Sequence, residues 1–238
     1  MPAAKNTSKP ERNAKPHFVC GGRFERDARA AGYQCIAGVD EAGRGSLFGP
    51  VFAAAVVLSL DRPIRGLNDS KLLTPARRHI LAGRIRERAI AWAVAAADVF
   101  EIDRINIYQA SVLAMKRAIE QLSPACDYLL LDAVRLTDMP VPQLPLIHGD
   151  ARCQSIAAAS ILAKTQRDEC MRKWHEVFPE FHLAENKGYS TEEHIAALQK
   201  HGPTMLHRFS FEPVRMATSV EIWTGYDQRE TTPNAAGA

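Results

Sequence analysis

The chain has 238 residues, of which 46% are apolar and 24% charged; these fractions lie close to globular averages and exclude a wholly disordered or collagen-like chain. Basic residues number 30 and acidic residues 27, so the formal net charge of +3 is too small to mark a nucleic-acid binder by itself. The length allows one large domain or two small ones, with a sizeable core.

The two ends of the chain are predicted to lack structure. Residues 1–17 are rich in Lys, Arg, Pro and Asn and nearly lack apolar residues, which predicts a disordered basic tail. Such a tail either contacts nucleic acid or is simply solvated, and the sequence leaves both open. Residues 224–238 are polar and then small, which predicts a flexible C-terminal tail. The folded part is therefore expected to span residues 18–223.

In the first half of the folded part, strand-like and helix-like segments alternate. Short apolar runs predict strands at 36–40, 51–58 and 90–97. Thr74 followed by Pro75 predicts the start of a helix that runs to about residue 88, because threonine caps helices and proline fits their first turn. Apolar residues at steps of three and four predict an amphipathic helix over 105–122.

The second half continues this alternation and then becomes helical. Two strands and a helix are predicted, at 128–131, 144–148 and 154–172. Ser190 with Glu193 predicts a capping box that opens a helix ending near His201, before a Gly-Pro stop signal. The order of elements indicates an α/β domain with a mixed sheet, and the segment after about residue 178 is predicted to be a helical C-terminal subdomain.

Acidic residues follow three of the predicted strands. Asp40 and Glu41 end the first, Asp132 follows the strand at 128–131, and Asp150 follows the fifth apolar segment. Because desolvated carboxylates repel each other, several that converge at strand ends need cations, and hard oxygen ligands suit Mg²⁺ or Mn²⁺. Any one of these acids could instead be a helix cap or part of an Asx turn. The pattern alone therefore indicates a metal-dependent enzyme without proving one.

A Gly-Arg-Gly segment at Gly43, Arg44 and Gly45 directly follows the first acidic pair. It matches neither the Walker phosphate-binding loop nor the Rossmann dinucleotide-binding pattern. Two glycines let the backbone approach another chain closely and offer N–H donors beside one guanidinium. A plain tight turn would look the same in the sequence.

The remaining composition indicates a soluble, non-secreted protein of the cytoplasm. Five scattered cysteines form no C-x-x-C pair and predict reduced thiols, at positions 20, 35, 126, 153 and 170. The longest uncharged stretch, 45–60, is shorter than the roughly 18–20 residues that a membrane crossing needs. No secretory signal pattern opens the chain.

Several motifs occur in the order typical of one known family. They are GVDEAGRG at 38–45 with GPV at 49–51; LNDSK at 67–71; LLD at 130–132; GD at 149–150 with SIAAASILAK at 155–164 and RD at 167–168; and NKGY at 186–189 with GPT at 202–204, HR at 207–208 and SF at 210–211. Over roughly residues 24–216 the chain resembles ribonuclease HII, the type 2 ribonuclease H family.

The resemblance implies an RNase H-like fold, in which helices flank a central mixed β-sheet and a helical part follows. Residues 18–223 would then be a ribonuclease HII catalytic domain. The implied activity is cleavage of the RNA strand of RNA–DNA hybrids, and of duplex DNA on the 5′ side of single embedded ribonucleotides. This cleavage leaves 5′-phosphate and 3′-hydroxyl ends and uses two Mg²⁺ or Mn²⁺ ions. The resemblance also implies that the enzyme is a monomer.

The resemblance also assigns roles to residues. It implies four metal ligands, with Asp168 as a competitor for the last of them: Asp40, Glu41, Asp132 and Asp150. The backbone at Gly43, Arg44 and Gly45 would read the 2′-hydroxyl at the RNA-to-DNA junction, and Tyr189 would stack on the next sugar. Four basic residues are expected to contact phosphates: Lys71, Lys164, Lys187 and Arg208. No histidine is assigned a catalytic role.

Local departures from the family pattern leave these metal ligands intact. The departing residues are Ser46, Phe48, Ala133 and Asn186. They could change the shape of local loops and the fit of the substrate. Two other functions remain open. One is a non-catalytic nucleic-acid binder that kept the fold, although acids facing a phosphate backbone argue against it. The other is a nuclease of different specificity, such as a DNA-junction resolvase.

Overall fold

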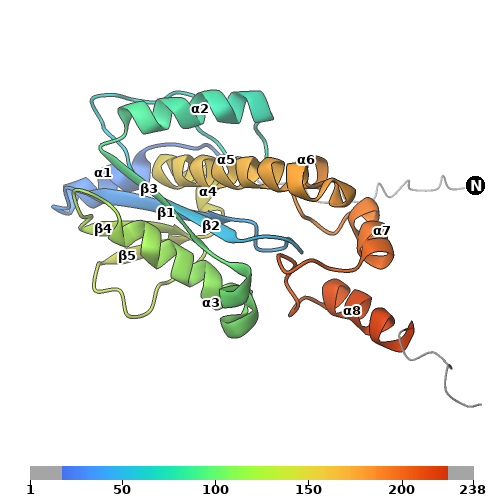
Figure 1. The fold of residues 1–238 in the computed structure, drawn as a ribbon. Coiled ribbons are helices and arrows are strands. Elements are labelled where there is room, and N and C mark those ends of the chain that lie inside the picture. Colours follow the sequence, from blue (N-terminus) through green and yellow to red (C-terminus); the bar gives the residue numbers. More distant parts are fainter. Residues whose placement is uncertain (1–17, 225–238) are drawn as a thin grey trace, which may run out of the picture.

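The computed structural model describes residues 18–224 (Figure 1). The predicted tail at 1–17, and residues 225–238 of the predicted C-terminal tail, lie outside the described residues. Among residues 18–224, no helix has the length and apolar character that a membrane crossing requires. All five cysteines fall within this range and are free, as predicted.

A five-stranded mixed sheet forms the centre of the molecule, as predicted. Its strands are β1 (Ile36–Ala42), β2 (Val51–Val57), β3 (Ala91–Ala97), β4 (Tyr128–Asp132) and β5 (Gln143–Leu146). In the order β3-β2-β1-β4-β5, the first two pairings are antiparallel and the last two are parallel. The parallel pairing of β1 with β4 brings the carboxyl ends of these two strands to the same edge of the sheet.

Helices cover both faces of this sheet, which explains the continuous apolar runs in β2 and β4. They are α1 (Arg23–Ala30), α2 (Pro75–Arg88), α3 (Val99–Glu120), α4 (Gly149–Arg152), α5 (Gln154–Val177), η1 (Pro179–Phe181), α6 (Leu183–Asn186), α7 (Glu192–His201) and α8 (Glu212–Thr224). Figure 1 shows α3 on one face and α5, backed by α2, on the other. Side chains of β2 alternate between the two resulting cores, with Ala53 and Ala55 facing α3, and Ala54 and Val56 facing α5.

Helix ends follow local chemistry, with two differences from prediction. Thr74 caps α2 as predicted, since its hydroxyl accepts a hydrogen bond from the backbone N of Arg77 at 3.3 Å. The predicted cap at Ser190 is wrong: Thr191 caps α7, because its hydroxyl accepts from the backbone N of His194. Helix α5 runs on to Val177, five residues beyond the predicted end at 172.

Several helical segments were missing from the sequence-based prediction, among them α1, the first part of α3 and the short α4. Helix α1 has only two buried residues and lacks a side-chain cap, so it gives little local signal. Helix α3 begins at Val99 rather than at the predicted residue 105. Asp98 and Glu101 form a capping box at this start. At Asn106, whose φ is +67°, two helical segments meet at a kink, and the apolar periodicity described only the second.

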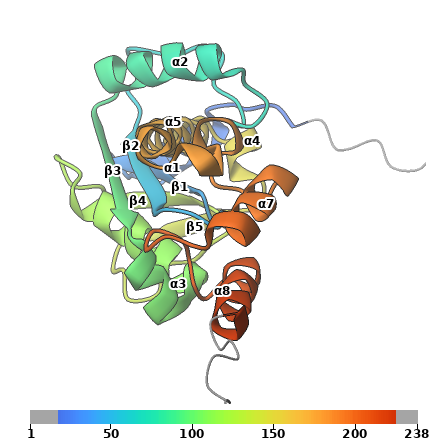
Figure 2. The same cartoon turned by 45° about the vertical axis from the view of Figure 1, so that its right-hand side comes forward.

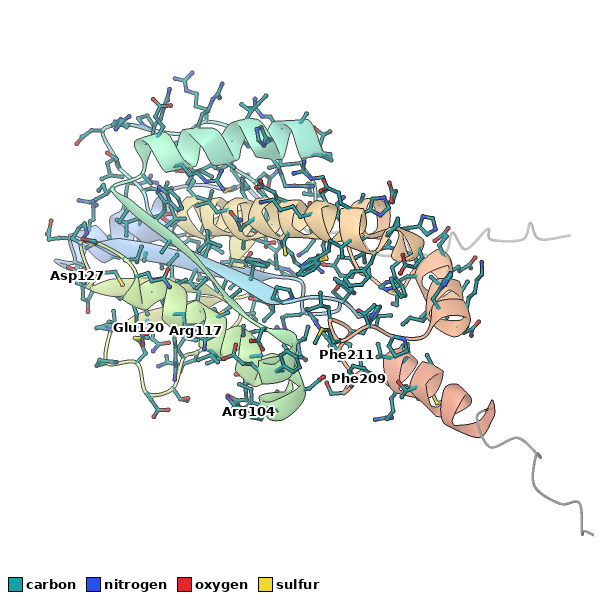
Figure 3. The ribbon with its side chains drawn as sticks, in the orientation of Figure 1. Arg104, Arg117, Glu120, Asp127, Phe209 and Phe211 are labelled. Atoms are coloured by element: carbon teal, nitrogen blue, oxygen red, sulfur yellow. The ribbon has the colours of Figure 1, made fainter. Side chains whose placement is uncertain are left out.

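The C-terminal helices pack around a small apolar core of their own. Phe48, from the loop after β1, joins Met171, Phe181, Leu198 and Val214 in this cluster. Figure 2 shows α7 between α5 and α8. The loop before α8 is held against α3, where Phe209 and Phe211 lie near the end marked by Arg104 (Figure 3). Asp103 of α3 accepts hydrogen bonds from the backbone N of Phe209 and Ser210.

Candidate functional site

Three carboxylates meet at the edge where β1 and β4 end. Asp40 lies on β1, Asp132 is the last residue of β4, and Asp150 lies in α4, just after β5. One oxygen of each lies within 4.8 Å of the others. The backbone N of Glu41 donates to Asp40, and that of Gly149 donates to Asp132 at 2.7 Å, which fixes both carboxylates in direction.

The electrostatics of this cluster favour a bound cation. Burial raises the pKa of the Asp40 carboxyl well above its ordinary value, and the charges of Glu41 and Asp132 raise it further. Burial likewise raises the pKa of Asp132 and of Asp150, and each is raised further by neighbouring acids. Converging hard oxygen donors that repel one another are the ligand set that Mg²⁺ or Mn²⁺ requires, so these residues fit a divalent ion.

The other two candidate acids lie differently. Glu41 is not one of the three clustered residues, because its carboxylate turns to Arg44, with 3.3 Å between Oε1 and Nη1. Its charge still reaches Asp40 and Asp132. Asp168 is part of a separate ion-paired group on α5 and lies outside the cluster. The structure therefore brings Asp150 rather than Asp168 to the other acids, and Glu41 as a metal ligand stays a prediction.

Lys71 is the cation next to the acidic cluster. Its ammonium lies 3.7 Å from an oxygen of Asp150, while its side chain keeps 77% of its surface exposed. Burial acts to lower the pKa of Lys71, but the charges of Asp150 and Asp69 outweigh it and the pKa is raised. The loop that carries Lys71 is fixed because the Ser70 hydroxyl lies 2.9 Å from that of Ser160 on α5. Lys71 thus presents a fixed positive charge beside the acids.

The Gly-Arg-Gly segment forms a tight loop against Tyr189. Gly43 has φ of +100°, and a Cβ there would lie 2.1 Å from Nε of Arg167, so only glycine fits. A Cβ at Gly45 would lie 4.0 Å from the Tyr189 ring, and Ser46 forms a β-bridge with Tyr189. Residues more than 140 positions apart therefore form one surface, with backbone on one side and a ring on the other.

Two buried arginines support this loop. Arg208 is 0% exposed, and its guanidinium donates to the carbonyls of Gly49 and Arg44, both at 2.9 Å. Burial, together with the smaller effect of the Arg167 charge, lowers its pKa to about 9. The prediction that Arg208 contacts phosphate needs correction, because a fully buried guanidinium bonded to backbone carbonyls presents no charge at the surface. It positions the backbone of the loop instead.

Arg167 is a functional candidate that the sequence-based reasoning missed. It is 0% exposed, donates to the Ser46 hydroxyl at 2.6 Å and to the Lys187 carbonyl at 2.8 Å, and lies 5.3 Å from the centre of the Tyr189 ring. Two signals could have revealed it: its position four residues after the buried Ala163 on the same helix, and its place in the RD motif at 167–168. Ser46, a departure from the family pattern, thus accepts a specific hydrogen bond.

The remaining predicted phosphate contacts, Lys164 and Lys187, lie near Tyr189. The ammonium of Lys164 bonds to Asp168 at 2.6 Å and lies 5.7 Å from the Tyr189 ring centre. The ammonium of Lys187 bonds to the carbonyl of Ala184. His207 is fully buried against Phe48, and burial together with His194 lowers its pKa to about 3, which agrees with a structural position.

A mixed five-stranded sheet that gathers carboxylates at the ends of adjacent strands, beside lysines and a backbone loop, defines an RNase H-like nuclease. The sequence matches the family Ribonuclease HII over residues 37–214. The chain belongs to the ribonuclease HII family. It is therefore a hydrolase, an endonuclease of the ribonuclease H type that acts on RNA–DNA.

Individual relatives agree with this assignment. The chain is 64% identical to Ribonuclease HII of Solibacter usitatus over 198 residues, which cover 83% of this chain and 86% of that protein. It is 52% identical to Ribonuclease HII of Koribacter versatilis over 216 residues, which cover 91% of this chain and 85% of that protein.

Solved structures confirm the predicted fold. The ribonuclease H2 from Pyrococcus horikoshii is similar with a TM-score of 0.67 at 23% identity, covering 79% of this chain and 98% of that one. Bst-RNase HIII, solved in complex with Mn²⁺, is similar with a TM-score of 0.61 at 20% identity, covering 81% of this chain and 72% of that one. These likenesses concern the fold alone.

Proposed function

We propose that the protein nicks duplex DNA on the 5′ side of embedded ribonucleotides and cleaves the RNA strand of RNA–DNA hybrids by two-metal-ion hydrolysis. The products would carry 5′-phosphate and 3′-hydroxyl ends. The observation that carries this proposal is the meeting of two features: the acidic cluster Asp40, Asp132 and Asp150, and the loop at Gly43–Gly45 that faces Tyr189. One feature suits the reaction and the other suits recognition of a ribose.

The acidic cluster, with Glu41 beside it, would hold Mg²⁺ or Mn²⁺. Bound divalent ions supply an activated water and stabilise the 3′ oxygen as it leaves. The chain's own part is to hold two of the carboxylates in a fixed direction, through the hydrogen bonds that the backbone N of Glu41 and of Gly149 donate to Asp40 and Asp132. Their mutual repulsion, which raises the pKa of Asp40, favours the binding of a cation.

Recognition of the junction would come from the loop and the ring. Backbone groups at Gly43, Arg44 and Gly45 can approach a 2′-hydroxyl closely because neither glycine has a side chain. Tyr189, 37% exposed, offers a ring face to the following deoxyribose. Lys71 would contact the phosphate near the cleaved bond, and Lys164 and Lys187 phosphates farther along. We further propose that the enzyme acts as a monomer in the cytoplasm.

The decisive experiment uses a labelled DNA duplex that contains one ribonucleotide, incubated with Mg²⁺, with Mn²⁺ and with EDTA. We expect one metal-dependent nick on the 5′ side of the ribonucleotide, and no cleavage of the matched all-DNA duplex. Binding without a nick in either metal would identify a non-catalytic binder. Cleavage of a branched all-DNA junction, with the ribonucleotide duplex left intact, would identify a resolvase.

A further inference from the structure

A second basic site lies beside the candidate site, where the start of α2 faces the second half of α5. It is a pocket of about 290 Å³, lined by Pro75, Arg78, His79, Thr165, Asp168, Arg172 and Lys187. Four of these side chains are basic or can be protonated, and one is acidic. The first turn of α2, which begins at Pro75, adds the partial positive charge of a helix N-terminus.

The single carboxylate that lines the pocket already forms two ion pairs. Asp168 pairs with Arg78 at 3.1 Å through one oxygen and with Lys164 at 2.6 Å through the other. Neither Arg172 nor Lys187 forms an ion pair within residues 18–224. The pocket therefore carries positive charge that no ion pair among the described residues neutralises.

Two further observations point to an anionic ligand. Burial lowers the pKa of Lys187, and although Asp168 opposes this, the charges of Lys164 and Arg172 lower it further, as expected where cations crowd together. Thr165 lines the pocket, is only 8% exposed, and its hydroxyl has no hydrogen-bond partner in the described part of the chain. A bound anion would relieve the repulsion between the cations.

The pocket continues the surface that carries Tyr189. Lys164 joins the two, because its ammonium bonds to Asp168 in the pocket wall and lies over the Tyr189 ring. A duplex whose sugar lies on Tyr189 therefore has its next phosphates close to the pocket. Resting on the function proposed above, we propose that this pocket is a second phosphate-binding site that holds a backbone phosphate of the substrate duplex away from the cleaved bond.

The first test measures binding without cleavage. Fluorescence anisotropy would follow a ribonucleotide-containing duplex in EDTA, with wild-type protein, Arg172→Gln, Arg172→Lys and the control Arg62→Gln. Arg62 is an exposed arginine whose partner Glu87 lies at the opposite end of α2, so its variant removes the same charge elsewhere. We expect Arg172→Gln to weaken binding several-fold and to make the salt dependence of log K shallower by about 0.9, the value for one lost phosphate contact.

Arg172→Lys should restore most of the affinity, because it keeps the charge. Equal affinities and salt slopes for Arg172→Gln and Arg62→Gln would overturn the inference. This assay measures binding alone, so its result is independent of cleavage. If Arg172→Gln binds more weakly but the wild-type protein does not nick the ribonucleotide duplex, the proposed function is overturned and the phosphate site is retained. Normal nicking without any effect at Arg172 would overturn the phosphate site alone.

The second test locates the phosphate. Duplexes shortened step by step on one side of the ribonucleotide, and then on the other, would be bound by wild-type protein and Arg172→Gln. If the site lies at a fixed distance from the ribonucleotide, wild-type protein and Arg172→Gln should bind with equal affinity once the duplex is too short to reach it. This should happen when the duplex is shortened on one side of the ribonucleotide and not on the other. A difference that stays the same at every length on both sides would contradict the proposal.

Discussion

Two neighbouring regions of the molecule handle buried charge in opposite ways. In the acidic cluster, Asp40, Asp132 and Asp150 crowd within 4.8 Å and raise one another's pKa. Beneath the Gly-Arg-Gly loop, Arg167 and Arg208 are equally buried, but their guanidinium groups donate to carbonyls and a hydroxyl. Crowded charges of like sign suit the binding of a ligand of opposite charge, whereas charges bonded to the surrounding backbone hold a shape.

The arginines are not satisfied by hydrogen bonds alone. Nε and Nη1 of Arg167 and Nη2 of Arg208 are buried without a hydrogen-bond partner. Each guanidinium instead lies 5.3 Å from an aromatic ring centre, Arg167 at Tyr189 and Arg208 at Phe211. Such cation–π contacts stabilise a desolvated guanidinium. The loop region is therefore expected to respond to mutation through stability, and the acidic region through metal binding and catalysis.

The largest expected effect comes from the acidic region. Asp40→Asn should lower the cleavage rate by more than the roughly 100-fold that loss of an outer-sphere partner of a metal site costs. The variant should melt no lower than wild type without metal, because a repulsive buried charge is removed. Single-turnover rates and thermal melts in EDTA would test both expectations. Near-normal cleavage by Asp40→Asn would contradict the ligand assignment.

The converse prediction concerns the loop region. Arg208→Met should lower the free energy of unfolding by about 3 kcal/mol, because two charge-assisted hydrogen bonds to buried carbonyls are lost. Denaturant melts would measure this change. Arg172→Met serves as the matched control on an exposed side chain and should cost little. Comparable stability of the two variants would break the contrast between the regions.

Tyr189 tests recognition rather than stability. Tyr189→Ala should reduce junction cleavage by roughly 10–100-fold, since stacking on an aromatic ring is worth about 1–3 kcal/mol. Tyr189→Phe keeps the ring and should stay within a few-fold of wild type. The informative quantity is the ratio of cleavage at a junction to cleavage inside a long hybrid. A proportional fall on both substrates would argue against junction selection.

The pH dependence of stability should separate metal-free from metal-bound protein. Burial raises the pKa of Asp40 and Asp150 above 3.8, so between that pH and the raised pKa the folded state binds more protons than the unfolded state. Stability without metal is therefore expected to fall as pH rises through this window. Millimolar Mg²⁺ should reduce this fall, because a bound cation stabilises the ionised carboxylates. Melting curves in EDTA that show no fall with pH would contradict the crowding of these carboxyls.

The smallest expected effect lies outside both regions. Thr74→Ala removes the side-chain cap of α2 and should cost about 1 kcal/mol of stability without changing cleavage. Paired denaturant melts and cleavage rates would test this. A large loss of activity would contradict this expectation and show that the position of α2 matters to the site.

Local sequence determined the strands, the cap at Thr74 and the placement of acids after strands. An apolar run followed by Asp predicts a buried strand with an acid at its carboxyl end. Asp40 and Asp132 could therefore be predicted to lie close together if β1 and β4 pair in parallel. Local sequence failed for α1, for the first segment of α3 and for the cap at Thr191, where two neighbouring residues could serve equally well as caps.

Only the tertiary structure decided which charges are buried and what they contact. The partners of Arg208 are backbone carbonyls of Arg44, 164 positions earlier, and Gly49, 159 positions earlier, and backbone carbonyls carry no sequence signature. Asp150 and Asp168 look alike in the chain, but one lies among acids and the other between Arg78 and Lys164. Sequence fixes the side chains that are present, whereas long-range packing sets the desolvation and neighbours that decide whether a charge binds a ligand or holds the fold.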